Sequence, residues 1–118
     1  MMVKAKYNQD VKSIMDEILL KFPEVVAGKM FGYPACYLNK KIIGRIYADS
    51  VGLKVPETMA KGLLENAHIT HFQPLGRRKM REWIQINHMD PKDYFLDQSI
   101  FEASVTYLRA LTEKGSST

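Results

Sequence analysis

The chain has 118 residues, of which 46% are hydrophobic and 25% are charged, a composition that excludes disordered and low-complexity proteins. Seventeen lysines and arginines against thirteen acidic residues leave a net charge of +4, which favours anionic partners without requiring one. A chain of this size buries enough surface for one core, so we expect a single domain over residues 1–118 with an ordered core from about residue 8 to about residue 113.

No apolar run approaches the ~20 residues that a membrane-spanning helix needs. The first seven residues also lack the apolar stretch of a secretory signal peptide. We therefore expect a cytoplasmic protein without a membrane partner. Cys36 is the only cysteine, which excludes an internal disulfide and a thiolate metal site built from one chain.

The first predicted element is an amphipathic helix over residues 8–22. Asn8 suits its N-cap, and Pro23 is expected to end it because proline lacks an amide donor. The apolar residues recur every three or four positions, as on one face of a helix: Val11, Ile14, Met15, Ile18, Leu19 and Phe22.

After Gly28 the apolar pattern changes to a period of two. Residues 35–38, 42–48 and 51–55 read as short strands with tight turns between them, which predicts an antiparallel meander. Pro56 and Glu57 suit the first turn of a short helix that ends at residue 66 or 67.

The remaining elements are two strands and a helix. Residues 69–72 and 80–86 are rich in strand-forming residues, and Ser99 with Glu102 fits a capping box at the start of a helix that runs to about residue 114. The fold class expected is α+β: an antiparallel sheet of four to five strands packed with an N-terminal helix, a short middle helix and a C-terminal helix.

Because side chains alternate across a strand, the predicted strands can be sorted into two faces. One face is apolar and is assigned to the core beneath the helices. Its members are Cys36, Leu38, Ile42, Ile46, Val51, Leu53, Val55, Ile84 and Ile86.

The second face mixes cations with flat aromatic rings, together with Ile43 and Gln85. Such rings can stack on nucleobases and such cations can bind phosphates, so this face is the candidate binding surface. The same residues could instead pack beneath a crossing helix or line a homodimer contact. The candidate residues are Tyr37, Arg45, Tyr47, Lys54, Arg81 and Trp83, assisted by the basic run Arg77, Arg78 and Lys79; the reading favoured for that run by itself is a solvated hairpin.

Neither a catalytic site nor a metal site is predicted. His68 and His71 fall on opposite faces of their strand, and His88 is distant in sequence with no carboxylate or cysteine recognised beside it, so all three are read as surface or partly buried residues. Cys36 is assigned to core packing. No phosphate-binding glycine loop or nucleophile motif is present, so we expect no cofactor, and an enzyme is the least supported class. The acidic residues Asp90, Asp93 and Asp97 are read as helix-starting residues.

Two segments resemble a known family. They are Lys29-Met30-Phe31-Gly32, with the strand-rich span that follows it to Glu57, and the segment from Gly76 to Trp83. Together they resemble the N-terminal domain of the TfoX/Sxy proteins, relatives of YjbR-like small α/β domains, over about residues 9–111. In the motif, Gly32 permits a tight bend, and Met30 and Phe31 are expected to be apolar anchors. The resemblance implies a bacterial regulatory or interaction module that acts near transcription.

The function expected from these observations is a non-enzymatic regulatory or binding domain, associated with nucleic acid through its basic and aromatic face. One alternative is a protein-interaction module that buries this face in a homodimer or against a regulatory protein partner. The other is a small-ligand domain or unrecognised enzyme, which would need Tyr37, Arg45 and Trp83 to converge in a concavity.

Overall fold

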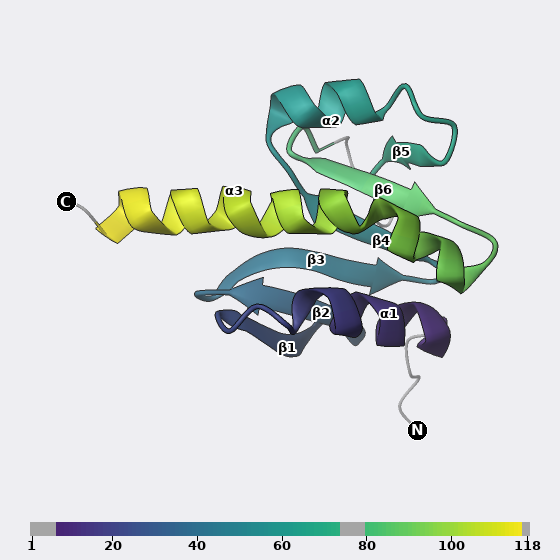
Figure 1. Cartoon of the computed structure of the whole chain (residues 1–118), viewed down its shortest axis with the longest axis horizontal. Helices are drawn as coiled ribbons and strands as arrows, with labels where there is room; N and C mark the ends of the chain where they lie inside the picture. Colours follow the sequence, from purple (N-terminus) through teal and green to yellow (C-terminus); the bar gives the residue numbers. More distant parts are fainter. Residues whose placement is uncertain (1–6, 74–79, 117–118) are drawn as a thin grey trace.

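A computed structural model describes residues 7–73 and 80–116 of the chain (Figure 1). It confirms the α+β class, and within the described residues no helix is both long and apolar enough to cross a membrane. In chain order the elements are α1 (Gln9–Leu19), β1 (Val25–Met30), β2 (Tyr33–Leu38), β3 (Lys41–Tyr47), β4 (Ser50–Lys54), α2 (Glu57–Leu63), β5 (Ile69–His71), β6 (Trp83–Asn87), the 3-10 helix η2 (Pro91–Asp97) and α3 (Gln98–Ser116).

The six strands form one antiparallel sheet in the order β1-β2-β3-β4-β6-β5. The meander from β2 to β4 agrees with the sequence analysis, but β1 was not predicted. In this edge strand only Val25 is buried, so its sequence lacks the apolar alternation by which strands are recognised. The chain leaves β4 through α2 and returns to the far edge as β5, which places β6 between β4 and β5.

The helix ends follow local hydrogen bonding. Asn8 is the N-cap of α1, because its side chain accepts hydrogen bonds from the backbone amides of Asp10 and Val11. The predicted capping box at Ser99 was wrong: η2 leads directly into α3, and Ser99 lies inside the helix. Asp90 caps η2 instead, by accepting from the amide of Lys92.

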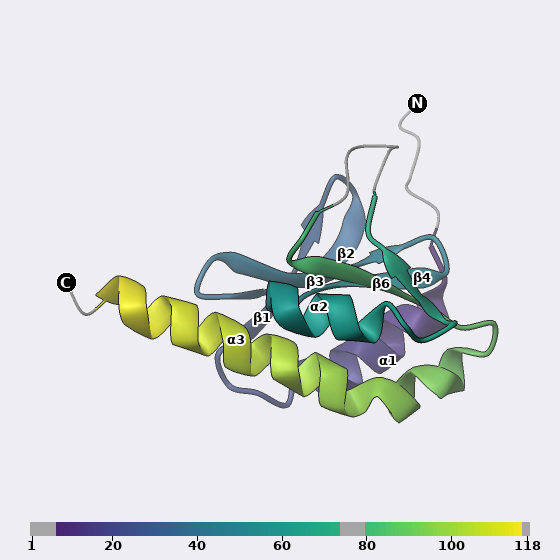
Figure 2. The same ribbon diagram turned by 90° about the horizontal axis from the view of Figure 1, so that it is seen from above.

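The core lies between one face of the sheet and the helices, and Figure 2 shows α1 and α3 together on that side. Ser104 on α3 ties the layers together, because its hydroxyl donates to the backbone oxygen of Lys54 at 2.6 Å. The strands supply Val25, Cys36, Leu38, Ile43, Ile46, Val51, Leu53, Ile69, Ile84 and Ile86 to this core, and Val55, which follows β4, also belongs to it.

Two residues of β3, Ile42 and Ile43, were assigned to the wrong faces. Ile43 is fully buried in the core, whereas Ile42 is only half-buried and lies outside the core cluster. The cause is a register shift between β2 and β3 at Cys36 and Tyr37, where an extra residue in β3 interrupts the strict alternation. A simple period of two does not anticipate such a bulge.

On the second face, the ring of Phe72 lies directly over Gly52. Phe72 is buried although it lies outside the core cluster. A Cβ atom added at Gly52 would come within 2.6 Å of the Phe72 ring, so only glycine leaves room for the ring to lie against β4. Gly52 therefore positions the aromatic residues of the second face.

We predict that Gly52→Ala lowers the free energy of unfolding by about 1–3 kcal/mol, because the Phe72 ring must move away from the sheet. Gly62→Ala is the matched control. A Cβ atom at Gly62 meets no atom within 4 Å, and alanine in α2 should raise stability by about 0.5–1 kcal/mol. Urea unfolding measures both, and equal effects from the two variants would contradict the contact between Phe72 and β4.

The burial of the Cys36 thiol leads to a second prediction, on how stability depends on pH. Burial raises the pKa of Cys36 to about 12 from an ordinary value of 9.0. Between these pH values the unfolded chain loses the thiol proton while the folded chain keeps it, so the free energy of unfolding falls as pH rises. Cys36→Ala should remove up to about 1.4 kcal/mol per pH unit of that decline. Urea unfolding across this range tests it, and an identical slope in both proteins would refute it.

Candidate functional site

The second face of the sheet is organised around Arg45, in the middle of β3. The Arg45 side chain lies against three aromatic rings, which with it form what we call the Arg45 cluster. Its guanidinium carbon is 5.0 Å from the ring centre of Tyr33, 5.5 Å from that of Tyr47 and 5.8 Å from that of Phe72. Only 5% of Arg45 is exposed, although it lies outside the hydrophobic core. The rings themselves therefore shield this cation.

Arg45 is held with little hydrogen bonding. Its buried Nε atom has no hydrogen-bond partner, and among the described residues no acidic side chain forms an ion pair with it. Burial lowers the pKa of the guanidinium below its usual value, while Tyr33 and Tyr47 act in the opposite direction. Attraction between the charge and the ring faces, at ~0.5–2 kcal/mol for each contact, offsets part of the desolvation cost.

The other candidate residues are only partly brought together. Trp83 is 6% exposed and stacks on Phe72 with ring centres 5.2 Å apart, so one face of its indole is already covered. Lys54 forms an ion pair with Glu82 at 3.4 Å, and the Tyr37 hydroxyl donates to the backbone oxygen of Lys29. Arg81 is exposed, whereas Arg77, Arg78 and Lys79 lie outside the described residues.

A pocket of about 260 Å³ opens between α2 and β6. Of the candidate face it includes Arg81 and Trp83 but neither Tyr37 nor Arg45, so the three-residue convergence required for a small-ligand site is not found. Lys61 adds a second cation, and its Nζ lies 3.6 Å from the carboxylate of Glu57. The pocket is lined by Glu57, Ala60, Lys61, Leu64, His71, Met80, Arg81 and Trp83.

In the turn between β1 and β2, Gly32 has its expected role but Phe31 does not. Gly32 has a φ of 84°, as the tight bend requires, but Phe31 also has a positive φ of 52° and is 83% exposed. Phe31 is therefore not the buried anchor that the sequence analysis expected. It presents a bare phenyl ring at the end of an edge hairpin.

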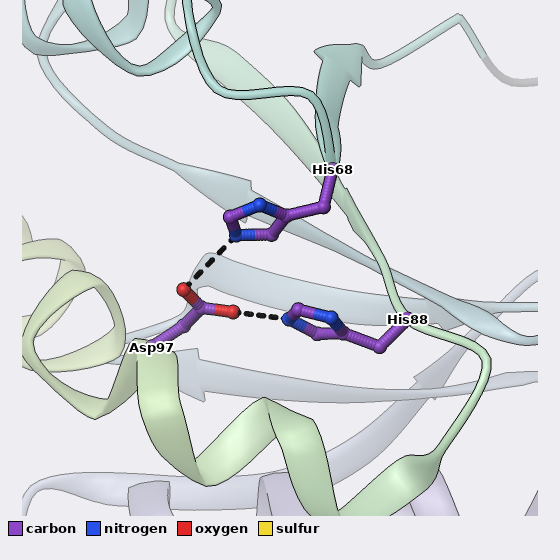
Figure 3. Close-up of side chains that lie close together, drawn as sticks. All are labelled: His68, His88 and Asp97. Carbon is purple, nitrogen blue, oxygen red and sulfur yellow. Dashed lines mark hydrogen bonds and ion pairs between the residues drawn. The ribbon is translucent and has the colours of Figure 1, made fainter.

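A second cluster lies at the other end of β6, where both imidazoles point toward the Asp97 carboxylate (Figure 3). His68 Nε2 is 3.2 Å from Asp97 Oδ1, and His88 Nε2 is 2.5 Å from Asp97 Oδ2. The two imidazole rings stack with centres 4.6 Å apart. We call His68, His88 and Asp97 the His-Asp-His cluster; their ligand atoms all lie within 4.8 Å of one another.

Sequence reasoning missed several members of these clusters for identifiable reasons. Tyr33 precedes a predicted strand and Phe72 ends another, and neither residue was assigned to a face. Asp97 was expected to start a helix, and the structure brings its carboxylate to two histidines. No local sequence pattern connects these residues. Their contact depends on the pairing of β5 with β6, in which the backbone amide of Asn87 donates to the oxygen of His68 and places His68 beside the end of β6.

We predict that the aliphatic stem of Arg45 contributes more to stability than its charge. Arg45→Met keeps an unbranched side chain beneath the rings and removes a charge whose Nε is unpaired, so the free energy of unfolding should change by less than about 1 kcal/mol. Arg45→Ala also removes the packing and should cost about 2–3 kcal/mol. Urea unfolding of both variants measures the two contributions. Equal losses in the free energy of unfolding would show that the charge of Arg45, and not its stem, provides the stability.

Comparison of the chain with protein-family models, with curated proteins and with solved structures yields no match.

Proposed function

We propose that this chain is a non-enzymatic binding domain of the TfoX N-terminal type that recognises an anionic partner at the pocket between α2 and β6. The observation that carries the proposal is the composition of the pocket wall. Trp83 and the apolar side chain of Leu64 line it beside the cations Lys61 and Arg81. Such a wall suits a partner that carries a flat ring next to a negative charge.

A single-stranded nucleic acid is the partner that these features favour. A cavity of this size accommodates about one planar ring system, which lies at the small end of ligand pockets. Arg81 is exposed at its rim and can meet a phosphate. In the sequence, Arg81 follows the basic run Arg77, Arg78 and Lys79 with only Met80 between them, so this part of the sequence is strongly cationic.

The rest of the second face is a support for this pocket. Arg45 is buried, and Phe72 covers one face of the Trp83 indole, so neither Arg45 nor that indole face is available to a partner. The buried thiol of Cys36, with its pKa of about 12, is also unsuited to nucleophilic catalysis. These features favour binding over an enzymatic reaction.

A homodimer is the second candidate, and exposed apolar side chains at one edge of the sheet favour it. Val26 in β1 is 63% exposed, and Phe31 in the adjoining turn is 83% exposed. An edge strand with such side chains could pair with a second copy of the chain or with a protein partner.

We predict that short single-stranded oligonucleotides of about ten nucleotides bind at this pocket with salt-dependent affinity. Trp83 is the only tryptophan, so its fluorescence should change when a base enters the pocket, in parallel with the anisotropy of a labelled strand. Arg81→Ala should weaken binding several-fold and reduce the slope of log affinity against log salt by about 1.

Lys92→Ala is the matched control, because it removes one positive charge from an exposed position on η2, away from the pocket. If both variants weakened oligonucleotide binding equally, the effect would come from net charge alone, and the proposed binding site at the pocket would be wrong. Light scattering completes the test. A mass of twice 13.6 kDa that persists in high salt, with no oligonucleotide bound, would favour the homodimer instead.

A further inference from the structure

We propose that the His-Asp-His cluster is a binding site for one divalent transition-metal ion of the Zn²⁺ class. The cluster lies at the opposite end of β6 from the pocket described above. The proposal is therefore independent of the proposed nucleic-acid binding, and it rests on the geometry of three side chains from separate parts of the chain.

Backbone pairing places the two histidines side by side. His68 immediately precedes β5 and His88 immediately follows β6, and the antiparallel register of these strands brings their ends together. Asn87 reinforces this arrangement: its backbone amide donates to the His68 oxygen at 2.8 Å, and its side-chain amide donates to the Thr70 hydroxyl at 3.1 Å. The separation of the two imidazoles is thus set by the sheet.

The third ligand is positioned by η2. Tyr94 is fully buried, and its hydroxyl accepts from the backbone amide of His88 and lies 2.7 Å from the backbone oxygen of Asp49. This ties the 3-10 helix to the end of β6. Asp97 is the last residue of η2, and its carboxylate consequently faces both rings (Figure 3).

The donor atoms are already close to the spacing that a metal ion needs. Bonds of ~2.0–2.1 Å in a tetrahedral site separate neighbouring ligand atoms by roughly 3.4 Å. Asp97 Oδ1 and His68 Nε2 are 3.2 Å apart, which agrees with that spacing. Asp97 Oδ2 and His88 Nε2 are 2.5 Å apart, so the ion would require a small outward rotation of one of these side chains.

The burial of the Asp97 carboxylate is a further reason to expect a cation. The Asp97 side chain is only 10% exposed, and its polar partners within the described residues are the two imidazoles. A buried carboxylate is stabilised by hydrogen-bond donors or by a nearby positive charge, such as a metal ion. A metal ion held between this carboxylate and the two imidazole nitrogens would supply such a charge.

The ligand set indicates the kind of ion. Two imidazole nitrogens and one carboxylate suit Zn²⁺, Co²⁺ or Fe²⁺, whereas Mg²⁺ and Ca²⁺ prefer oxygen ligands throughout. Three protein ligands leave a fourth position for water, and the His68 side chain is 34% exposed on the solvent side. The bound ion would join the start of β5, the end of β6 and the end of η2.

The test uses tag-free, chelator-treated full-length protein titrated with Co²⁺ and then with Zn²⁺. We expect one Co²⁺ per chain, visible absorption bands, displacement by Zn²⁺ and no competition from Mg²⁺. His68→Gln, His88→Gln and Asp97→Asn should each weaken metal binding by at least ~10-fold. Loss of a group that merely hydrogen-bonds a metal ligand already lowers metal affinity by about that factor, and loss of a ligand itself should cost at least as much. His71→Gln is the matched control, because His71 is exposed on β5 outside the cluster.

NMR of the histidine rings gives a readout that needs no variant. Zn²⁺ should shift the ring signals of His68 and His88 and leave those of His71 unchanged, and the thermal midpoint should rise with metal concentration. Circular dichroism checks that each variant is folded. Absence of binding at millimolar Co²⁺ and Zn²⁺, or equal affinity in His71→Gln and folded His68→Gln, would overturn the proposal.

Discussion

The pairing of β5 with β6 is the constraint on which both candidate sites depend. β6 lies between β4 and β5, so its two ends meet different neighbours. At its start, Trp83 stacks on Phe72, the residue that follows β5. At its end, the same register brings His68 beside Asn87 and therefore close to His88. A one-residue slip would reverse the faces of β5 and dismantle both arrangements.

The placement of the helices explains the form of the second face. The helices share one core with the opposite face of the sheet, so the aromatic residues of the second face must shield each other. Phe72 lies over Gly52, and its ring also contacts the guanidinium of Arg45. These side chains are consequently committed to packing. The groups left available for partners lie at the margins: the pocket beside α2, the exposed Phe31 and the His-Asp-His cluster.

Local patterns in the sequence predicted most of the elements, because each pattern depends on neighbouring residues. The apolar spacing of α1 and the N-cap at Asn8 are examples. The edge strand β1 was missed because it buries little, and Ile43 was misplaced because a bulge shifts the register. Arg45 and Trp83 were rightly placed together on one face, but their burial depends on Tyr33 and Phe72, whose position is decided by tertiary packing.

The His-Asp-His cluster lay beyond sequence reasoning for a similar reason. His68 and Asp97 are 29 residues apart, and their contact requires both the β5–β6 pairing and the docking of η2 by Tyr94. Histidine spacing alone draws attention to His68 and His71, which do not share a face. Only a prediction of strand register would have connected His68 with His88.

The register of β5 against β6 can be measured directly by disulfide trapping in a Cys36→Ala background. Thr70 and Gln85 are cross-strand partners, so the Thr70→Cys, Gln85→Cys pair should oxidise readily within one chain. His71→Cys with Gln85→Cys is the matched control, because those positions would become partners only after a one-residue slip. Preferential oxidation of the 70–85 pair is the result expected here. Preferential oxidation of the control pair would contradict the register and both sites built on it.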